Sequence, residues 1–175
     1  MAHLVMPQLD VLLHSSIALF PYGKAFAEAE RDPMAVMHTS GSTGIPKPIV
    51  SPQGLWSIVD EYRTWPEFHG TKVSYPVWAE KAKRIFLSFP FFHAGGMQVF
   101  TNMTIGLDTP CVLPIADRPM TGELVLETLL HSGSDAAMLP SSILEELSQS
   151  EEGIQTLQKL AFVGFGGGTD AIEQF

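Results

Sequence analysis

Short apolar runs alternate with longer amphipathic segments through most of the chain. Each run is five or six residues long and is bounded by glycine, proline or polar residues, which is typical of strands buried in a sheet. The runs predict strands over Met34–His38, Ile85–Phe89, Cys111–Ile115, Asp135–Leu139 and Leu160–Phe165.

In the segments between these runs, apolar residues recur every three or four positions, as they do on one face of a helix. The recurrence predicts helices over Ala25–Arg31, Gln53–Phe68, 94–106, Thr121–His131 and Ser141–Gln149. Thr121 is a suitable N-cap for the helix that it begins. Between Thr64 and Arg84 a more polar stretch with two prolines and a glycine is expected to be irregular.

Strand and helix thus alternate about five times, which favours an α/β fold with a mostly parallel sheet covered by helices. Right-handed crossovers would place the loops that follow the strands at one edge of the sheet, where such folds bind ligands. Residues 1–33 are expected to form a partial lead-in, and residues 34–175 a partial core domain.

Composition narrows the range of functions. The 175 residues carry a net charge of −9 with only ten lysines and arginines, and no basic stripe is present. We therefore expect no nucleic-acid partner and no membrane partner. A signal peptide and an apolar run of roughly 20 residues are both lacking, so a cytoplasmic location is expected. Cys111, the one cysteine, lies in an apolar run and is predicted to be a buried structural thiol.

The strongest chemical signal is the loop Thr39–Lys47, with the sequence TSGSTGIPK, directly after the first predicted strand. Its glycines allow close approach of the backbone to a ligand, and its hydroxyls and Lys47 suit a polyphosphate. The glycine spacing and the proline after Lys47 exclude a Walker loop, and no nucleophile elbow is present. Composition alone also allows a flexible surface loop.

The order of these residues resembles the phosphate-binding signature of the adenylate-forming superfamily, which includes acyl-CoA synthetases, luciferases and nonribosomal peptide synthetase (NRPS) adenylation domains. Two later segments, FPFFHAGG from Phe89 and VGFGGG from Val163, resemble further motifs of that superfamily. His38 and Pro48 resemble the fungal NRPS-like enzymes in particular. The resemblance implies part of the large N-terminal domain of such an enzyme.

The resemblance implies a reaction in two halves. A carboxylate attacks the α-phosphate of ATP, with Mg²⁺ neutralising the phosphates, and gives an acyl-adenylate and pyrophosphate. A thiol, usually the phosphopantetheine of a carrier domain or of CoA, then takes the acyl group. The implied phosphate-binding residues are Thr39, Ser40, Gly41, Ser42, Thr43, Gly44 and Lys47; those of the acyl pocket are Phe92, His93, Gly95 and Gly96; and those of the adenine and substrate turn are Gly166, Gly167 and Gly168.

Plainer interpretations of two of these groups stay open. His93 follows two phenylalanines and is equally well a packed residue, since the stretch Phe91–Met103 is predicted to be core. Gly166–Gly168 could equally be an ordinary turn after a strand. A dinucleotide-binding loop is disfavoured, because the required glycine spacing breaks at Thr169.

The substrate class follows from a missing residue. Amino-acid-activating domains usually carry an aspartate in the motif around His93, and this chain has no acidic residue there. We therefore expect an aryl, keto or other carboxylic acid without an α-amino group.

The resemblance also implies parts that lie beyond Phe175 in the family, including a small C-terminal lid with the catalytic lysine. No complete catalytic set is therefore expected here, and the isolated chain is expected to be inactive in adenylation. The alternative is a non-catalytic remnant that acts as a nucleotide-binding or interaction module. An α/β hydrolase is disfavoured because the nucleophile elbow is missing.

Overall fold

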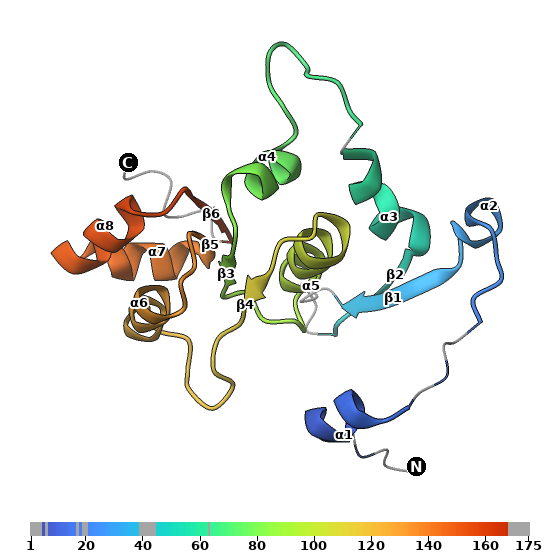
Figure 1. The fold of residues 1–175 in the computed structure, drawn as a ribbon, viewed down its shortest axis with the longest axis horizontal. Coiled ribbons are helices and arrows are strands. Elements are labelled where there is room, and N and C mark those ends of the chain that lie inside the picture. The colour runs from blue at the N-terminus through green and yellow to red at the C-terminus, as the bar shows by residue number, and fades with distance from the viewer. Residues whose placement is uncertain are drawn as a thin grey trace.

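A computed structural model describes residues 5, 7–16, 18, 21–38, 45–62 and 64–167. Figure 1 shows a central sheet with helices on both of its faces and a separate pair of strands, β1 and β2, that leads into α3. None of the described helices combines the length and the apolar character that a membrane span needs.

The central sheet has four parallel strands in the order β4–β3–β5–β6. β3 (Ile85–Leu87) and β5 (Ala136–Pro140) lie at its centre, with β4 (Cys111–Val112) and β6 (Phe162–Gly166) at its edges. Every residue of β3 is fully buried, as is typical of a parallel strand covered on both faces. The prediction of an α/β fold with a mostly parallel sheet is confirmed.

Side chains of the central strands alternate between two apolar layers. Ile85, Leu87 and Met138 contact α4 (Ser74–Lys81), α5 (Ala94–Thr101) and the π-helical turn η1 (Asn102–Gly106). Phe86, Ala137 and Leu139 lie on the opposite face. The helices of that face are α6 (Gly122–His131), α7 (Ser141–Ser148) and α8 (Glu151–Gln158). The result is a three-layer arrangement whose strand ends meet at common edges of the sheet.

The first predicted strand does not join this sheet. β1 (Pro33–His38) pairs antiparallel with β2 (Pro48–Pro52), with Val36 opposite Val50. The first of the five predicted strands therefore lies outside the parallel sheet. β2 was not predicted because it begins and ends with proline, which argues against a strand. The prolines are tolerated there because a missing ladder hydrogen bond costs little at the end of a strand.

One predicted helix is shorter than expected, and two helices were not predicted. α3 (Gln53–Tyr62) ends six residues before the predicted Phe68. α4 occupies part of the stretch expected to be irregular; its Pro76 is the third helical residue, where the missing N–H would have no acceptor in the helix. α8 was not predicted; the Ser150 hydroxyl caps it by accepting the Gly153 N–H at 3.0 Å.

Smaller differences concern element length. α1 (Leu9–His14) is a helix in a segment for which no element was predicted, and α2 (Phe26–Ala29) is a single turn of the predicted helix over Ala25–Arg31. The predicted N-cap is confirmed, because the Thr121 hydroxyl accepts the Leu124 N–H at 3.3 Å. The helix with a clear capping residue was therefore predicted accurately, whereas the short helices near the N-terminus were not.

The thiol of Cys111 is half-buried against the apolar layer beneath α5, and burial raises its pKa to about 11. At pH 8 about one thiol in a thousand is then ionised, against roughly a quarter for an ordinary cysteine. We expect an aromatic disulfide reagent to react with the native protein at least about 10-fold more slowly than with the urea-unfolded protein. The native rate should still be rising at about pH 10, which lies below the raised pKa, and equal native and unfolded rates at pH 8 would contradict this environment.

Candidate active site at the carboxyl edge of the sheet

Two of the three sequence motifs meet at the carboxyl edge of the parallel sheet. The segment after β3 leads through Phe89 into α5, and β6 ends at Gly166. A Cβ atom on Gly166 would lie 3.9 Å from Cζ of Phe89, so the aromatic ring reaches the glycine turn. The FPFFHAGG segment and the glycine turn are thus neighbours in space, as expected for loops that follow parallel strands.

His93 caps the helix that follows it. Its backbone is extended, and its Nδ1 atom accepts the N–H of Gly95 at 3.1 Å, which satisfies one of the donors at the start of α5. The imidazole is exposed and is not a packed core side chain. The plainer interpretation of His93 as a buried core residue is therefore wrong.

The two glycines after His93 have different environments. A Cβ on Gly96 would lie 2.3 Å from the carbonyl oxygen of Pro90 and 2.8 Å from that of Phe89, so only glycine fits there. A Cβ on Gly95 would meet nothing closer than Nδ1 of His93 at 3.4 Å, an ordinary contact. Gly96 therefore lets α5 start tight against the backbone that leaves β3.

The two aromatic residues before His93 have different environments. Phe92 is 92% exposed, whereas Phe91 packs edge-on against Phe100 with ring centroids 4.9 Å apart. Val99 and Met103 are buried, so the prediction of a core stretch holds for the later part of the segment and is wrong for Phe92. No buried contact holds the Phe92 ring, which leaves it available at the edge of the site.

The remaining predicted residues are described only in part. Thr39, Ser40, Gly41, Ser42, Thr43, Gly44 and Gly168 lie outside the described residues. Lys47 directly precedes β2, and Gly167 directly follows β6 with a φ of 79°, which favours glycine. Among the described residues, no atom lies within 4 Å of the position that a Cβ on Gly167 would take. The phosphate-binding role of the Thr39–Lys47 loop stays a prediction.

Comparison with known proteins decides the family. The model of the AMP-binding enzyme family matches residues 9–171. The chain belongs to the AMP-binding enzyme family. It is 46% identical over 155 residues to a carboxylic acid reductase of Neurospora crassa, covering 88% of this chain and 15% of the reductase. It is 33% identical over 169 residues to an isocyanide synthase–NRPS hybrid of Aspergillus fumigatus, covering 94% and 11% respectively.

A solved structure shares the fold. The ATP-bound crystal structure of MatB from Rhodopseudomonas palustris superposes with a TM-score of 0.58 at 17% identity, covering 90% of this chain and 28% of MatB. The resemblance to adenylate-forming and fungal NRPS-like proteins is confirmed. The chain spans 11–15% of the length of the two curated relatives.

Two serines that the sequence did not single out support the backbone of this candidate site. The Ser88 N–H and hydroxyl both donate to the carbonyl of Met138, at 3.2 and 3.0 Å, and this buried residue ties β3 to β5. The Ser141 hydroxyl donates to the carbonyl of Gly167 and fixes the glycine turn to the start of α7. Ser88 lies inside the predicted strand Ile85–Phe89, and Ser141 lies two residues after the predicted strand Asp135–Leu139, so the sequence carried no signal that set either serine apart.

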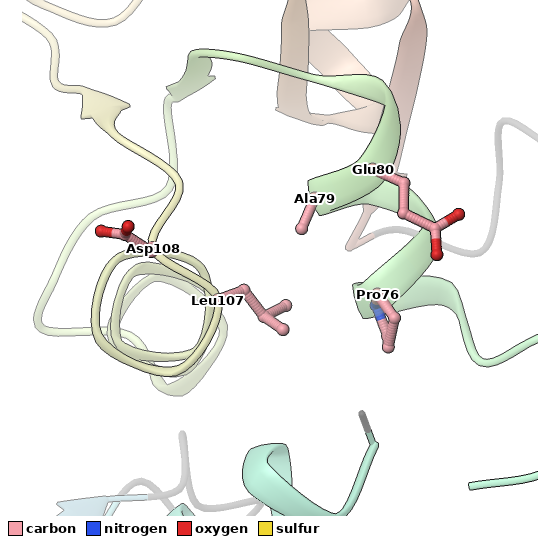
Figure 2. A pocket seen from close by; sticks show the side chains of 5 residues that line it. All are labelled: Pro76, Ala79, Glu80, Leu107 and Asp108. Carbon is pink, nitrogen blue, oxygen red and sulfur yellow. The ribbon is translucent and has the colours of Figure 1, made fainter. Parts of the chain in front are cut away.

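One hollow lies away from this edge, among the residues that precede β3 and β4. It measures about 370 Å³ between α4 and the residues after η1, and its lining is Pro76, Ala79, Glu80, Leu107 and Asp108. Figure 2 shows Leu107 directed toward Pro76 and Ala79, while the carboxylates of Glu80 and Asp108 turn away from each other. Its lining residues come shortly before β3 and β4 in the chain, so the hollow lies toward the amino edge of the sheet, where ligands of such folds do not bind. We therefore assign no chemistry to it.

Proposed function

We propose that this chain forms part of an enzyme that activates a carboxylic acid with ATP and then transfers the acyl group to a phosphopantetheine thiol. The observation that carries the proposal is the family match together with the meeting of Phe89, Gly166 and Gly167 at the carboxyl edge of the sheet. Parallel α/β sheets bind their ligands at this edge.

In the first half-reaction, a carboxylate oxygen of the acid forms a bond to the α-phosphorus of ATP. The bond from that phosphorus to the bridging oxygen breaks, and pyrophosphate leaves with the electron pair. In the second half, the thiol loses its proton to solvent and its sulfur forms a bond to the acyl carbon. The bond from that carbon to the phosphate oxygen breaks, and AMP leaves with the electron pair. Little covalent chemistry falls to the protein, so positioning and electrostatic stabilisation supply most of the acceleration.

Residues of this chain fit those tasks. The hydroxyl-rich loop up to Lys47 would hold the β- and γ-phosphates, where Mg²⁺ when bound would neutralise charge. The glycine turn at Gly166–Gly168 would take the adenine and the substrate, because glycine allows a ligand to approach the backbone closely. The start of α5 would face the acid. The catalytic lysine of the family's lid is not assigned to any residue here.

The acid is proposed to lack an α-amino group. No acidic side chain lies in the segment from Phe89 to Gly96 to pair with an amine, and the most similar relative compared above is named a carboxylic acid reductase. An aryl or keto acid is therefore the favoured substrate class. Stimulation of exchange by α-amino acids, with none by aryl or keto acids, would contradict this assignment.

Carboxylate-dependent exchange of radiolabelled pyrophosphate into ATP tests the proposal in the protein at its natural length. We expect exchange with aryl or keto acids and, for Lys47→Ala, a loss of about 10- to 100-fold in kcat/KM because a charge-assisted phosphate contact is removed. Lys72→Ala, whose ammonium pairs with Glu80 at 3.5 Å on another part of the surface, is the matched lysine control. ATP binding without exchange would favour a non-catalytic nucleotide-binding module.

A further inference from the structure

The boundary between β3 and β5 is the point at which the chain changes direction across the sheet. From β3 the chain continues through α5 to β4, and from β5 it continues through α7 and α8 to β6 on the other side. α5 and α7 lie on opposite faces of the sheet (Figure 1), so the two connections diverge where these strands end. Parallel α/β sheets bind their ligands in the crevice that such a divergence leaves.

The glycine turn after β6 is held from both sides of this crevice. On the β3 side, Cζ of Phe89 lies 3.9 Å from the position of a Cβ on Gly166. On the β5 side, the Ser141 hydroxyl donates to the carbonyl of Gly167. An apolar contact has little directional preference, whereas a hydrogen bond restricts the orientation of the peptide group that accepts it. The orientation of the Gly167 carbonyl therefore depends on Ser141.

Ser141 supplies a hydrogen bond at a position where the strand pairing has ended. The last paired residues of β5 and β6 are Pro140 and Gly166. Ser141 is already the first residue of α7, so the backbone turns away from β6 and only the hydroxyl reaches the Gly167 carbonyl. Gly167 has a φ of 79° and, as a glycine, has access to many other conformations. Without the hydroxyl, the turn would be free to populate them.

We propose that Ser141 is a positioning residue for ATP, because its hydroxyl keeps the glycine turn in the conformation that receives the adenine. The inference rests on the proposed function for the role of the turn, and on the hydrogen bond to Gly167 for the restraint. Ser141 acts through the turn and not by contact with a reacting atom. Its removal lowers the fraction of protein whose turn can bind ATP, and the apparent affinity falls in proportion to that fraction.

Isothermal titration calorimetry and pyrophosphate exchange in the protein at its natural length test the role. Ser141→Ala should raise the Kd and the KM for ATP about 3- to 10-fold, which corresponds to the loss of one ordinary hydrogen bond. The KM for the acid and the kcat at saturating ATP should stay within about two-fold, because the FPFFHAGG segment leaves β3 and does not depend on this bond.

Two further variants make the test specific to the hydroxyl. Ser141→Thr retains the hydroxyl and should bind ATP within about two-fold of the unsubstituted protein. Ser142→Ala removes the neighbouring hydroxyl from an exposed position of the same helix and should leave the affinity for ATP unchanged. The melting temperature of Ser141→Ala should fall by no more than about 4 °C, so the affinities are compared between folded proteins.

A purely structural role of Ser141 predicts a different result. A smaller folded fraction lowers the maximal rate and leaves the KM for ATP and the KM for the acid unchanged. An unchanged affinity of Ser141→Ala for ATP, or equal rises in the two KM values, would therefore overturn the proposal. A folded Ser141→Thr variant that binds ATP as weakly as Ser141→Ala would overturn it too.

Failure of the proposed function has its own signature. Binding of ATP by the unsubstituted protein without exchange for any carboxylic acid would refute the proposed function, and the affinities of the two Ser141 variants for ATP would still decide the positioning role. Exchange by the unsubstituted protein, together with an unchanged affinity of Ser141→Ala for ATP, would refute the positioning role alone.

Discussion

Replacing Gly96 with alanine is expected to destabilise the protein by about 2–3 kcal/mol, whereas the same change at the adjacent Gly95 is expected to be neutral or slightly stabilising. The new methyl group at position 96 would lie 2.3 Å from the Pro90 carbonyl oxygen and 2.8 Å from that of Phe89. Both obstacles are backbone atoms of the segment that leaves a buried strand, so neither can move away like a flexible side chain.

Gly95→Ala is the matched control, because it adds the same methyl group to the same turn of the same helix. Its nearest neighbour would be Nδ1 of His93 at 3.4 Å, and the N–H that His93 accepts is retained. Alanine also restricts the unfolded chain more than glycine, which is worth up to about 1 kcal/mol in a helix.

Urea unfolding followed by circular dichroism measures both variants. Equal stabilities for the two would show that α5 can shift away from Pro90, and the tight start of the helix would then not be a requirement of the fold. A clear difference would show that the FPFFHAGG motif demands its second glycine for structural reasons, in addition to any contact with the acid.

Local sequence signals were sufficient where an element carries its own pattern. α6 was placed correctly because it combines a capping threonine at Thr121 with apolar residues at helical spacing. β3, β5 and β6 were found because buried parallel strands are nearly continuous apolar runs. Two of the three motifs also lie at the sheet edge that this topology predicts.

The errors arise where long-range contacts decide the structure. β2 exists because it pairs with β1, and its own sequence between Pro48 and Pro52 indicates a turn more than a strand. At the end of η1, a Cβ on Gly106 would lie 2.5 Å from a methyl group of Val59 on α3, so the close packing of these two elements requires glycine there. Neither pairing nor close approach of two helices is visible in a local pattern.

Candidate site residues could be identified from sequence, but their geometry could not. The motif around His93 suggested an acyl pocket, yet only the structure shows that Nδ1 caps α5 and that Phe92 is 92% exposed. Ser88 and Ser141 were missed because a lone serine after a strand has no distinctive pattern. Their roles depend on the positions of the Met138 and Gly167 carbonyls.

The opposite, amino edge of the sheet is held by Asp135, and its replacement by alanine is expected to cost about 2–3 kcal/mol. The carboxylate accepts the Lys83 N–H with both oxygens, at 3.0 and 2.9 Å, and the Arg84 N–H at 2.9 Å. The backbone of Asp135 also donates to the Arg84 carbonyl at 3.1 Å and accepts the Ala161 N–H at 2.7 Å. One residue thus joins the starts of β3, β5 and β6.

Asp135→Asn should cost less than Asp135→Ala, because one amide oxygen still accepts while the amide NH₂ group faces a backbone donor. Asp117→Asn, an exposed loop aspartate, serves as the control for the loss of one negative charge and should change stability by no more than about 0.5 kcal/mol. Denaturant unfolding of the three variants measures these differences. A loss for Asp135→Ala as small as that of the control would mean that the sheet does not depend on this carboxylate.

Because Asp135 lies at the amino edge of the sheet, its variants also test whether the active site is confined to the carboxyl edge. Since the candidate active site is at the carboxyl edge, the folded fraction of Asp135→Asn should retain the pyrophosphate exchange activity of the unsubstituted protein even though less urea unfolds it. Gly96→Ala should lose activity and stability together, because it displaces the backbone that carries His93. Loss of activity in folded Asp135→Asn would show that the amino edge contributes to the chemistry, which would contradict a site confined to the carboxyl ends of the strands.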